Sequence, residues 1–163
     1  MSAIGKYVVL RREAYRECVR LVGNVHTEST GKWMFKKQVT CGLEEFNAAW
    51  KAAVVEEVAF DYSGYVIGNY LDAQAAVNGI PADAFERSPD ALALNKVFTA
   101  AMPFEKAATF EKFDEQKLLA FCKDEYGEED AQGMCEAIQA AHEFYTGGLA
   151  RISKENVVLF VIQ

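Results

Sequence analysis

The sequence has little proline and no long apolar run, and both deficits limit the class of protein. Of its 163 residues only 3 are proline, whereas 51% are hydrophobic and 12% are aromatic. This composition supplies enough apolar side chains for a core and excludes intrinsic disorder. No stretch approaches the roughly 20 consecutive apolar residues that a membrane-spanning helix needs, so no membrane association is expected. We predict one globular domain over residues 1–163 that buries roughly 70% of its unfolded surface.

Targeting and redox motifs are also missing. No apolar run followed by small residues stands near the first residue, so no secretory signal is predicted. The four cysteines, Cys18, Cys41, Cys122 and Cys135, form no CxxC pair, which argues against a zinc ribbon or thioredoxin-type chemistry. We therefore expect a cytoplasmic protein whose thiols are reduced and mostly buried.

Known catalytic and ligand-binding motifs are absent as well. The sequence contains no HxxxH, HExxH, GxxxxGK[ST] or GxGxxG pattern. It has two histidines, and His142 stands seven residues after Cys135 on one predicted helix, about 10 Å along its axis, too far for a thiol and its base. We predict no metal site, no cofactor and no catalytic residue. The alternative is a small hydrolase or transferase that uses carboxylates without a recognisable motif.

The negative charge is concentrated in the later part of the chain. Residues 1–40 carry eight basic and three acidic side chains, so the other residues carry a net charge of −12 within a total of −7. An acidic body repels nucleic acid and attracts basic protein surfaces. We expect a basic protein partner and no direct binding of nucleic acid, although the same acidity also favours solubility in general.

Short β-branched segments near both ends predict strands. Residues 7–10 are mostly β-branched or aromatic, which predicts a short strand. Residues 157–162 are six apolar residues without alternation, which indicates a central strand covered on both faces. Residues 32–41 alternate between apolar and polar side chains, which predicts a half-buried antiparallel strand.

The middle of the chain predicts helices. Phe46, Trp50, Val54 and Val58 recur every four residues and indicate a helix over 43–60. Ser88, followed by Pro89, is typical of a helix start. We further expect helices over 12–22, 68–78, 89–102, 114–123 and 129–145, the last one stopped by Gly147 and Gly148. The predicted fold class is α+β: a small mixed or antiparallel sheet containing the N- and C-terminal strands, packed against about five helices.

Two acidic segments are candidates for partner binding. The first mixes tyrosines with carboxylates, which together can anchor a basic protein surface, although a core-facing tyrosine stripe is the other interpretation. The second is a weak calcium loop at most, and otherwise a solvated turn between helices. The candidate residues are Asp61, Tyr62, Tyr65, Tyr70 and Asp72 in the first segment, and Asp124, Glu125, Glu128, Glu129 and Asp130 in the second.

These features predict a non-enzymatic acidic binding protein. We expect an inhibitor or an immunity or anti-defence protein that masks a basic surface of a protein partner, either catalytic or nucleic-acid-binding. Arg12, Arg16 and Arg20 are spaced to line one helix face. That face could instead contact the acidic body of a second copy, so a homodimer is the alternative assembly. A regulatory module that self-associates through exposed aromatic residues is a third hypothesis.

Overall fold

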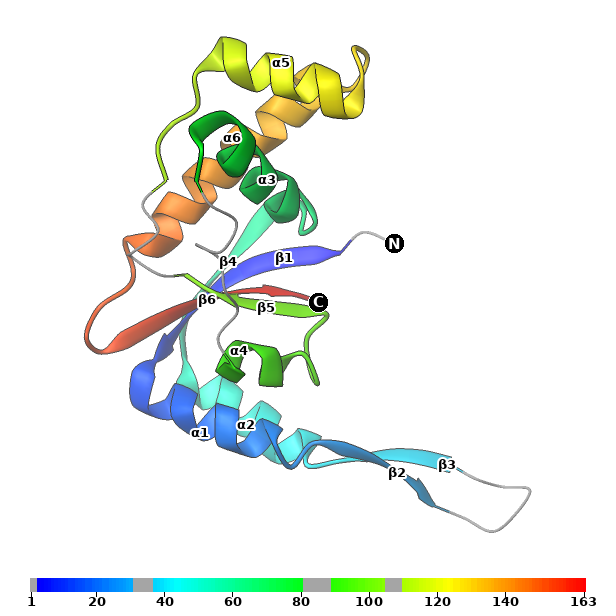
Figure 1. Cartoon of the computed structure of the whole chain (residues 1–163). Coiled ribbons are helices and arrows are strands. Elements are labelled where there is room, and N and C mark those ends of the chain that lie inside the picture. The colour runs from blue at the N-terminus through cyan, green and yellow to red at the C-terminus, as the bar shows by residue number, and fades with distance from the viewer. Residues whose placement is uncertain (1–2, 31–36, 81–88, 105–109) are drawn as a thin grey trace.

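The computed structural model describes residues 3–30, 37–80, 89–104 and 110–163, and places six helices and six strands in them (Figure 1). In chain order the elements are β1 (Ile4–Arg11), α1 (Arg12–Val22), β2 (His26–Thr30), β3 (Lys37–Cys41), α2 (Leu43–Ala53), β4 (Val54–Ser63), α3 (Val66–Asn78), α4 (Pro89–Leu94), β5 (Ala100–Pro103), α5 (Glu115–Tyr126), α6 (Ala131–Leu149) and β6 (Asn156–Ile162). Among these residues, no helix is both long and apolar enough to cross a bilayer.

Four strands form one antiparallel sheet in the order β4-β1-β6-β5. The N-terminal strand β1 and the C-terminal strand β6 are its two inner strands, and they pair without interruption from Gly5 opposite Ile162 to Arg11 opposite Asn156. The predicted α+β class, with both terminal strands in one sheet, is therefore confirmed, and the sheet is antiparallel rather than mixed.

The sheet is the middle layer between two groups of helices (Figure 1). In β1, Tyr7 and Val9 contribute to a core with α3, α5 and α6, whereas Val8 and Leu10 contribute to a core with α1, α2 and α4. Strand β6 alternates in the same way, since consecutive side chains of a strand point to opposite faces. This confirms that the unbroken apolar run near the C-terminus is a strand covered on both faces.

The predicted helix over 43–60 is half wrong, because α2 ends at Ala53 and β4 starts at Val54. The four-residue spacing of Val54 and Val58 misled the prediction, since four residues separate side chains on one face of a strand as well as of a helix. Pairing with β1, in which Val58 lies opposite Tyr7, gives these β-branched residues a place in the sheet that suits them better than a helix.

The predicted helix over 89–102 is also too long. Helix α4 ends at Leu94, and β5 begins at Ala100 and pairs with β6. The Asn95 side chain accepts a hydrogen bond from the backbone N–H of Ala101 (3.0 Å), which closes the turn between the two elements. Ser88, predicted to cap this helix, lies outside the described residues.

Strands β2 and β3 form a hairpin that projects away from the two helical layers (Figure 1). Of the predicted strand over 32–41, residues 37–41 are β3, and residues 32–36 lie outside the described part of the chain. The prediction that this strand is half-buried is wrong for 38–40, because these residues are exposed, including Val39 at 38%. Strand β2 was not predicted, since three of its five residues, His26, Glu28 and Ser29, are not typical of strands.

Candidate functional site

Nine of the ten predicted partner-binding residues are exposed. They come from three places: the end of β4 and the turn after it, the middle of α3, and the end of α5 with the turn before α6. Tyr62 and Tyr65 expose 40% and 60% of their surface and are among the exposed large hydrophobic residues of the described chain. We call these nine residues the acidic surface: Asp61, Tyr62, Tyr65, Asp72, Asp124, Glu125, Glu128, Glu129 and Asp130.

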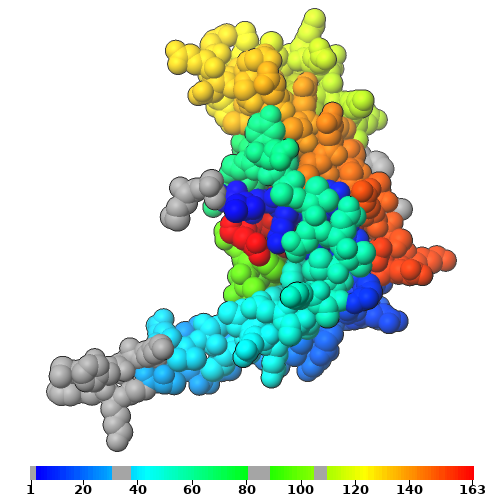
Figure 2. All heavy atoms as spheres, turned by 180° about the vertical axis from the view of Figure 1, so that it is seen from behind, coloured from blue at the N-terminus to red at the C-terminus, as the bar shows by residue number. Residues whose placement is uncertain are grey.

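The fold brings the two parts of the acidic surface together. Burial raises the pKa of Tyr126, and the neighbouring Cys122, then Asp72 of α3 and Glu125 of α5, raise it further. Near the start of α6, Asn69 Nδ2 of α3 also donates a weak hydrogen bond to Met134 Sδ (3.5 Å). Figure 2 shows the green α3 region and the yellow 120–130 segment on the same face of the molecule.

Most carboxylates of the acidic surface lack a compensating charge within the part of the chain that the structure describes. Glu128 pairs with Lys123 at 2.8 Å, but none of the other carboxylates has an ion-pair partner among the residues that the structure describes. In β4, by contrast, Glu56 pairs with Arg151 and Glu57 pairs with Lys6. The six uncompensated groups are Asp61, Asp72, Asp124, Glu125, Glu129 and Asp130.

Tyr70 is not part of this surface, because it is completely buried between α3 and α6. Its hydroxyl contacts His142 Nδ1 (3.1 Å) and Gln74 Nε2 (3.3 Å), and burial raises its pKa. The core-facing interpretation is correct for this tyrosine, because Tyr70 shares a helix face with the buried Val66 and Ala73.

Cysteine chemistry is restrained by burial. Cys18, Cys122 and Cys135 are buried and Cys41 is partly exposed, as expected for mostly buried thiols. Burial raises the pKa of Cys18 to about 11, and burial together with the neighbouring Cys135 raises that of Cys122 to about 12. Thiols with such pKa values are poor nucleophiles near neutral pH.

A hollow of about 250 Å³ lies beside His142. The same hollow is lined by the carboxylates Glu115 and Glu143 and by Lys112. Burial, and then the positive charge of Lys112, lowers the pKa of His142. A neutral imidazole is therefore favoured here, in agreement with the hydroxyl of Tyr70 at its Nδ1.

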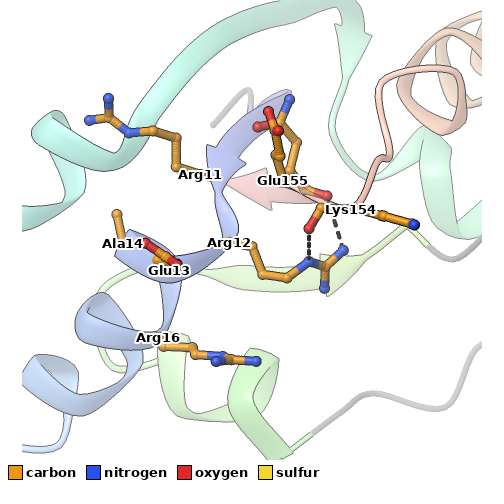
Figure 3. Close-up of a pocket in the computed structure, with 8 residues that line it drawn as sticks. Arg11, Arg12, Glu13, Ala14, Arg16, Lys154 and Glu155 are labelled. Carbon is orange, nitrogen blue, oxygen red and sulfur yellow. Dashed lines mark hydrogen bonds between the residues drawn. The ribbon is translucent and has the colours of Figure 1, made fainter.

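A second, basic hollow of about 590 Å³ surrounds the start of α1 (Figure 3). Arg12 donates from Nε to the carbonyl of Lys154 (3.1 Å) and from Nη2 to those of Ser153 (2.9 Å) and Asn156 (3.1 Å). Arg20, further along α1, pairs with Glu17. Of the predicted basic helix face, Arg16 is therefore the residue that has no hydrogen bond or ion pair with the described residues.

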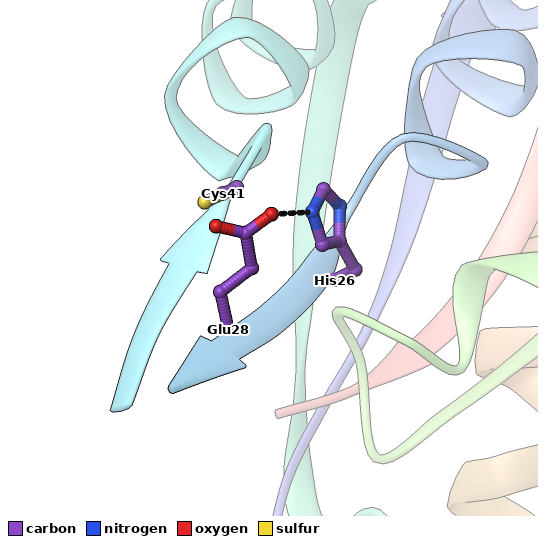
Figure 4. A group of neighbouring side chains, drawn as sticks. All are labelled: His26, Glu28 and Cys41. Carbon is purple, nitrogen blue, oxygen red and sulfur yellow. Dashed lines mark hydrogen bonds and ion pairs between the residues drawn. The ribbon is translucent and has the colours of Figure 1, made fainter. Parts of the chain in front are cut away.

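One group of potential metal ligands was missed by the sequence analysis (Figure 4). The ligand atoms of His26, Glu28 and Cys41 all lie within 4.8 Å of one another. His26 and Glu28 alternate on one face of β2, and Cys41 comes from the facing strand. The available sequence signal for a metal site was the His-x-Glu pair, whose side chains lie on one face of a strand. Cys41 comes beside this pair only when β2 and β3 form a hairpin.

Comparison with known proteins finds no matching family model, no similar curated protein and no similar solved structure.

Proposed function

We propose that this protein is an acidic binding protein that uses the acidic surface to mask a basic surface of a protein partner. An inhibitor or an immunity-type protein acts in this way when it covers a catalytic or nucleic-acid-binding face. The observation that carries the proposal is the gathering of six carboxylates without ion-pair partners in the described chain, next to two exposed tyrosines.

The uncompensated carboxylates provide the attraction. They come from β4, α3, the end of α5 and the turn before α6, so their field is not confined to a single loop. Such a field speeds the encounter with a positive partner, and it opposes the approach of nucleic acid. Close charge pairs formed across the interface each contribute about 1.5 kcal/mol or more in measured cases.

The exposed tyrosines provide the anchors. Tyr62 stands near the end of β4, and Tyr65 stands at the start of α3, so both rings are attached to regular elements of the fold. A tyrosine loses little side-chain entropy on binding and combines apolar area with a hydroxyl group, which explains why tyrosines are common in interface hot spots. Tyr70 has no part in this contact, because it is buried.

The test is a charge-matched comparison of two variants in affinity capture from a cell lysate. The first variant neutralises four groups of the acidic surface: Asp72→Asn, Glu125→Gln, Glu129→Gln and Asp130→Asn. The control neutralises four exposed carboxylates elsewhere: Glu13→Gln, Glu44→Gln, Glu45→Gln and Glu155→Gln. Both variants change the net charge equally, so any difference between them reports the position of the charges.

We expect the wild type and the control to retain the same basic protein, and the surface variant to lose it. With the purified partner, the affinity of the surface variant falls by about 10-fold or more at low salt. High salt reduces the difference, because it screens exposed charges. The absence of a captured protein, equal loss in both variants, or full binding by the surface variant would each contradict the proposal.

A further inference from the structure

We propose that His26, Glu28 and Cys41 bind a divalent cation of the zinc class at the base of the β2–β3 hairpin. The three side chains offer one imidazole nitrogen, one carboxylate oxygen and one thiol sulfur within 4.8 Å of one another. Nitrogen, oxygen and sulfur ligands together are typical of Zn²⁺, whereas Ca²⁺ and Mg²⁺ prefer oxygen ligands alone. This inference is independent of the proposed function, because the residues belong to a different part of the fold.

The hairpin register places the three ligands on one face. His26 lies directly opposite Cys41 in the antiparallel pair, and Glu28 follows His26 by two residues on the same strand. Directly opposite residues have Cβ atoms about 4.5–5.5 Å apart, close enough for two ligands of one metal ion. The register of the backbone pairing therefore places the three ligands on the same face of the hairpin.

The backbone is tightly packed where the hairpin joins the helices. Gly42, directly after Cys41, has a φ of 76°, and a Cβ added to it would lie 2.8 Å from the carbonyl oxygen of Asn24. Only glycine adopts this conformation readily and allows so close an approach. The two strands are thus held together at the end that carries His26 and Cys41.

The Asn24 carbonyl also fixes the tautomer of His26. His26 Nδ1 lies 2.7 Å from this oxygen, and a carbonyl can only accept a hydrogen bond, so Nδ1 carries a proton. In the neutral ring, Nε2 therefore has a free lone pair that points to the site. An N–H that donates to a backbone carbonyl is the usual outer contact of a metal-binding histidine.

The contact between Nε2 and Glu28 requires a positive species. Nε2 lies 2.8 Å from Glu28 Oε1, and in the neutral ring both atoms are acceptors. Two acceptors this close are stable only if a cation is shared between them, either a proton on the imidazole or a metal ion. A metal ion, unlike a proton, would also be bound by the third ligand atom nearby, Cys41 Sγ.

The dimensions are suitable for tetrahedral Zn²⁺ after small side-chain rotations. Bonds of about 2.0–2.3 Å in tetrahedral geometry place ligand atoms about 3.3–3.8 Å apart. His26 and Glu28 each expose 55% of their side chain, so a cation reaches them without any opening of the fold, and the fourth position faces solvent. On binding, a Zn–S bond forms, the S–H bond of Cys41 breaks, and its proton passes to solvent.

The test uses Co²⁺ as a spectroscopic probe on the full chain, which is first treated with a chelator and kept reduced. We expect one equivalent of Co²⁺ to give the intense visible bands of tetrahedral coordination and a thiolate-to-metal charge-transfer band, and Zn²⁺ to displace it. Cys41→Ser removes the charge-transfer band. His26→Gln and Glu28→Gln each weaken binding by about 10-fold or more, since even the loss of an outer contact weakens binding by about 10–100-fold.

The matched controls are Thr27→Ala and Thr40→Ala, which lie opposite each other in the same hairpin, between the ligand positions. Both should bind Co²⁺ like the wild type, and circular dichroism confirms that each variant is folded. The proposal is overturned if the wild type gives no tetrahedral spectrum, if the charge-transfer band persists in Cys41→Ser, or if the threonine controls weaken binding as much as the ligand variants do.

Discussion

The hydroxyl of Tyr70 lies 3.1 Å from Nδ1 of His142, and this contact connects α3 to α6 inside the core. Gln74 Nε2 donates to the same hydroxyl at 3.3 Å and to the carbonyl of Glu111 at 3.2 Å. Because the Tyr70 oxygen accepts from Gln74, its own hydrogen is free to be donated to His142. The three side chains form a buried chain of hydrogen bonds, and no buried side-chain nitrogen or oxygen of the described residues is without a partner.

Tyr70→Phe breaks this chain and should destabilise the protein. The substitution keeps the ring but leaves His142 Nδ1 without its donor, and an unsatisfied buried polar group costs about 1–3 kcal/mol. Urea unfolding monitored by circular dichroism measures the change. Tyr62→Phe is the control, because Tyr62 is 40% exposed and its hydroxyl can exchange hydrogen bonds with water. Equal stability of the two variants would show that the Tyr70–His142 contact contributes nothing.

His142 should make the protein less stable at mildly acidic pH. Burial and Lys112 lower its pKa below the ordinary 6.5 in the folded state. The unfolded state therefore binds the proton more readily, so stability falls as the pH drops through about 6.5 towards the lower folded pKa. Above this window His142 is neutral in both states and contributes no pH dependence.

The measurement compares urea midpoints between about pH 7 and pH 5 for His142→Gln and its parent. Both should carry His26→Gln, because hydrogen bonds to Asn24 and Glu28 raise the pKa of His26 and produce the opposite dependence, with stability lost as the pH rises through its folded pKa. We expect a shallower loss of stability in the His142→Gln protein. Identical slopes would contradict the assignment.

Local sequence patterns predicted those helices and strands that do not depend on pairing with a distant segment to decide between the two. Helix α1 has the predicted bounds, and the apolar run of β6 occupies the centre of the sheet as expected. Strand β4 was missed because Val54 and Val58 fit either period, and only pairing with β1 decides between them. The end of α4 was missed for a similar reason, since Ala101 becomes a strand residue by pairing with β6.

The candidate surfaces were predictable only in part. The sequence identifies both acidic segments, but their proximity depends on how α3 packs against α5 and α6, which no local pattern encodes. Tyr70 and Tyr65 are only five residues apart and look equivalent in sequence, yet one is buried and the other is 60% exposed. The His26–Glu28–Cys41 group depends on a strand pairing over 13 to 15 residues of chain, for which the polar β2 segment gives no signal.

Arg12 should stabilise the turn before β6. Its guanidinium donates to three backbone carbonyls of residues 153–156, which attaches the start of α1 to the start of the central strand. Arg12→Ala should cost about 1–2 kcal/mol in urea unfolding, since hydrogen bonds from charged groups are stronger than neutral ones but are partly replaced here by water. Arg12→Lys should recover less than half of this loss, because one ammonium cannot reach three carbonyls.

Arg16→Ala is the control for Arg12, because Arg16 lines the same hollow without a hydrogen bond or ion pair to the described residues. Its effect should stay within about 0.5 kcal/mol. If both alanine variants unfold at the same urea concentration, the Arg12 contacts do not stabilise the turn.

Substitution by alanine should lower the stability of the protein at Gly148 and raise it at Gly133, although both glycines belong to α6. Gly147 and Gly148 were predicted to end this helix, but α6 continues to Leu149, and Gly148 is buried. A Cβ at Gly148 would collide with the ring of Phe104, whereas a Cβ at Gly133 meets nothing within 4 Å. The glycine at 148 therefore provides room for an aromatic side chain and does not act as a helix stop.

Gly148→Ala should destabilise the protein by about 1–3 kcal/mol, because Phe104 is buried against Tyr145 and Phe160 and has little room to move. Gly133→Ala should stabilise it by about 0.5–1 kcal/mol, since alanine loses less backbone entropy than glycine in a helix. Thermal and urea unfolding of both variants measure the difference. Stabilisation by both substitutions would contradict the prediction, because it would mean that the Phe104 ring is not packed on Gly148.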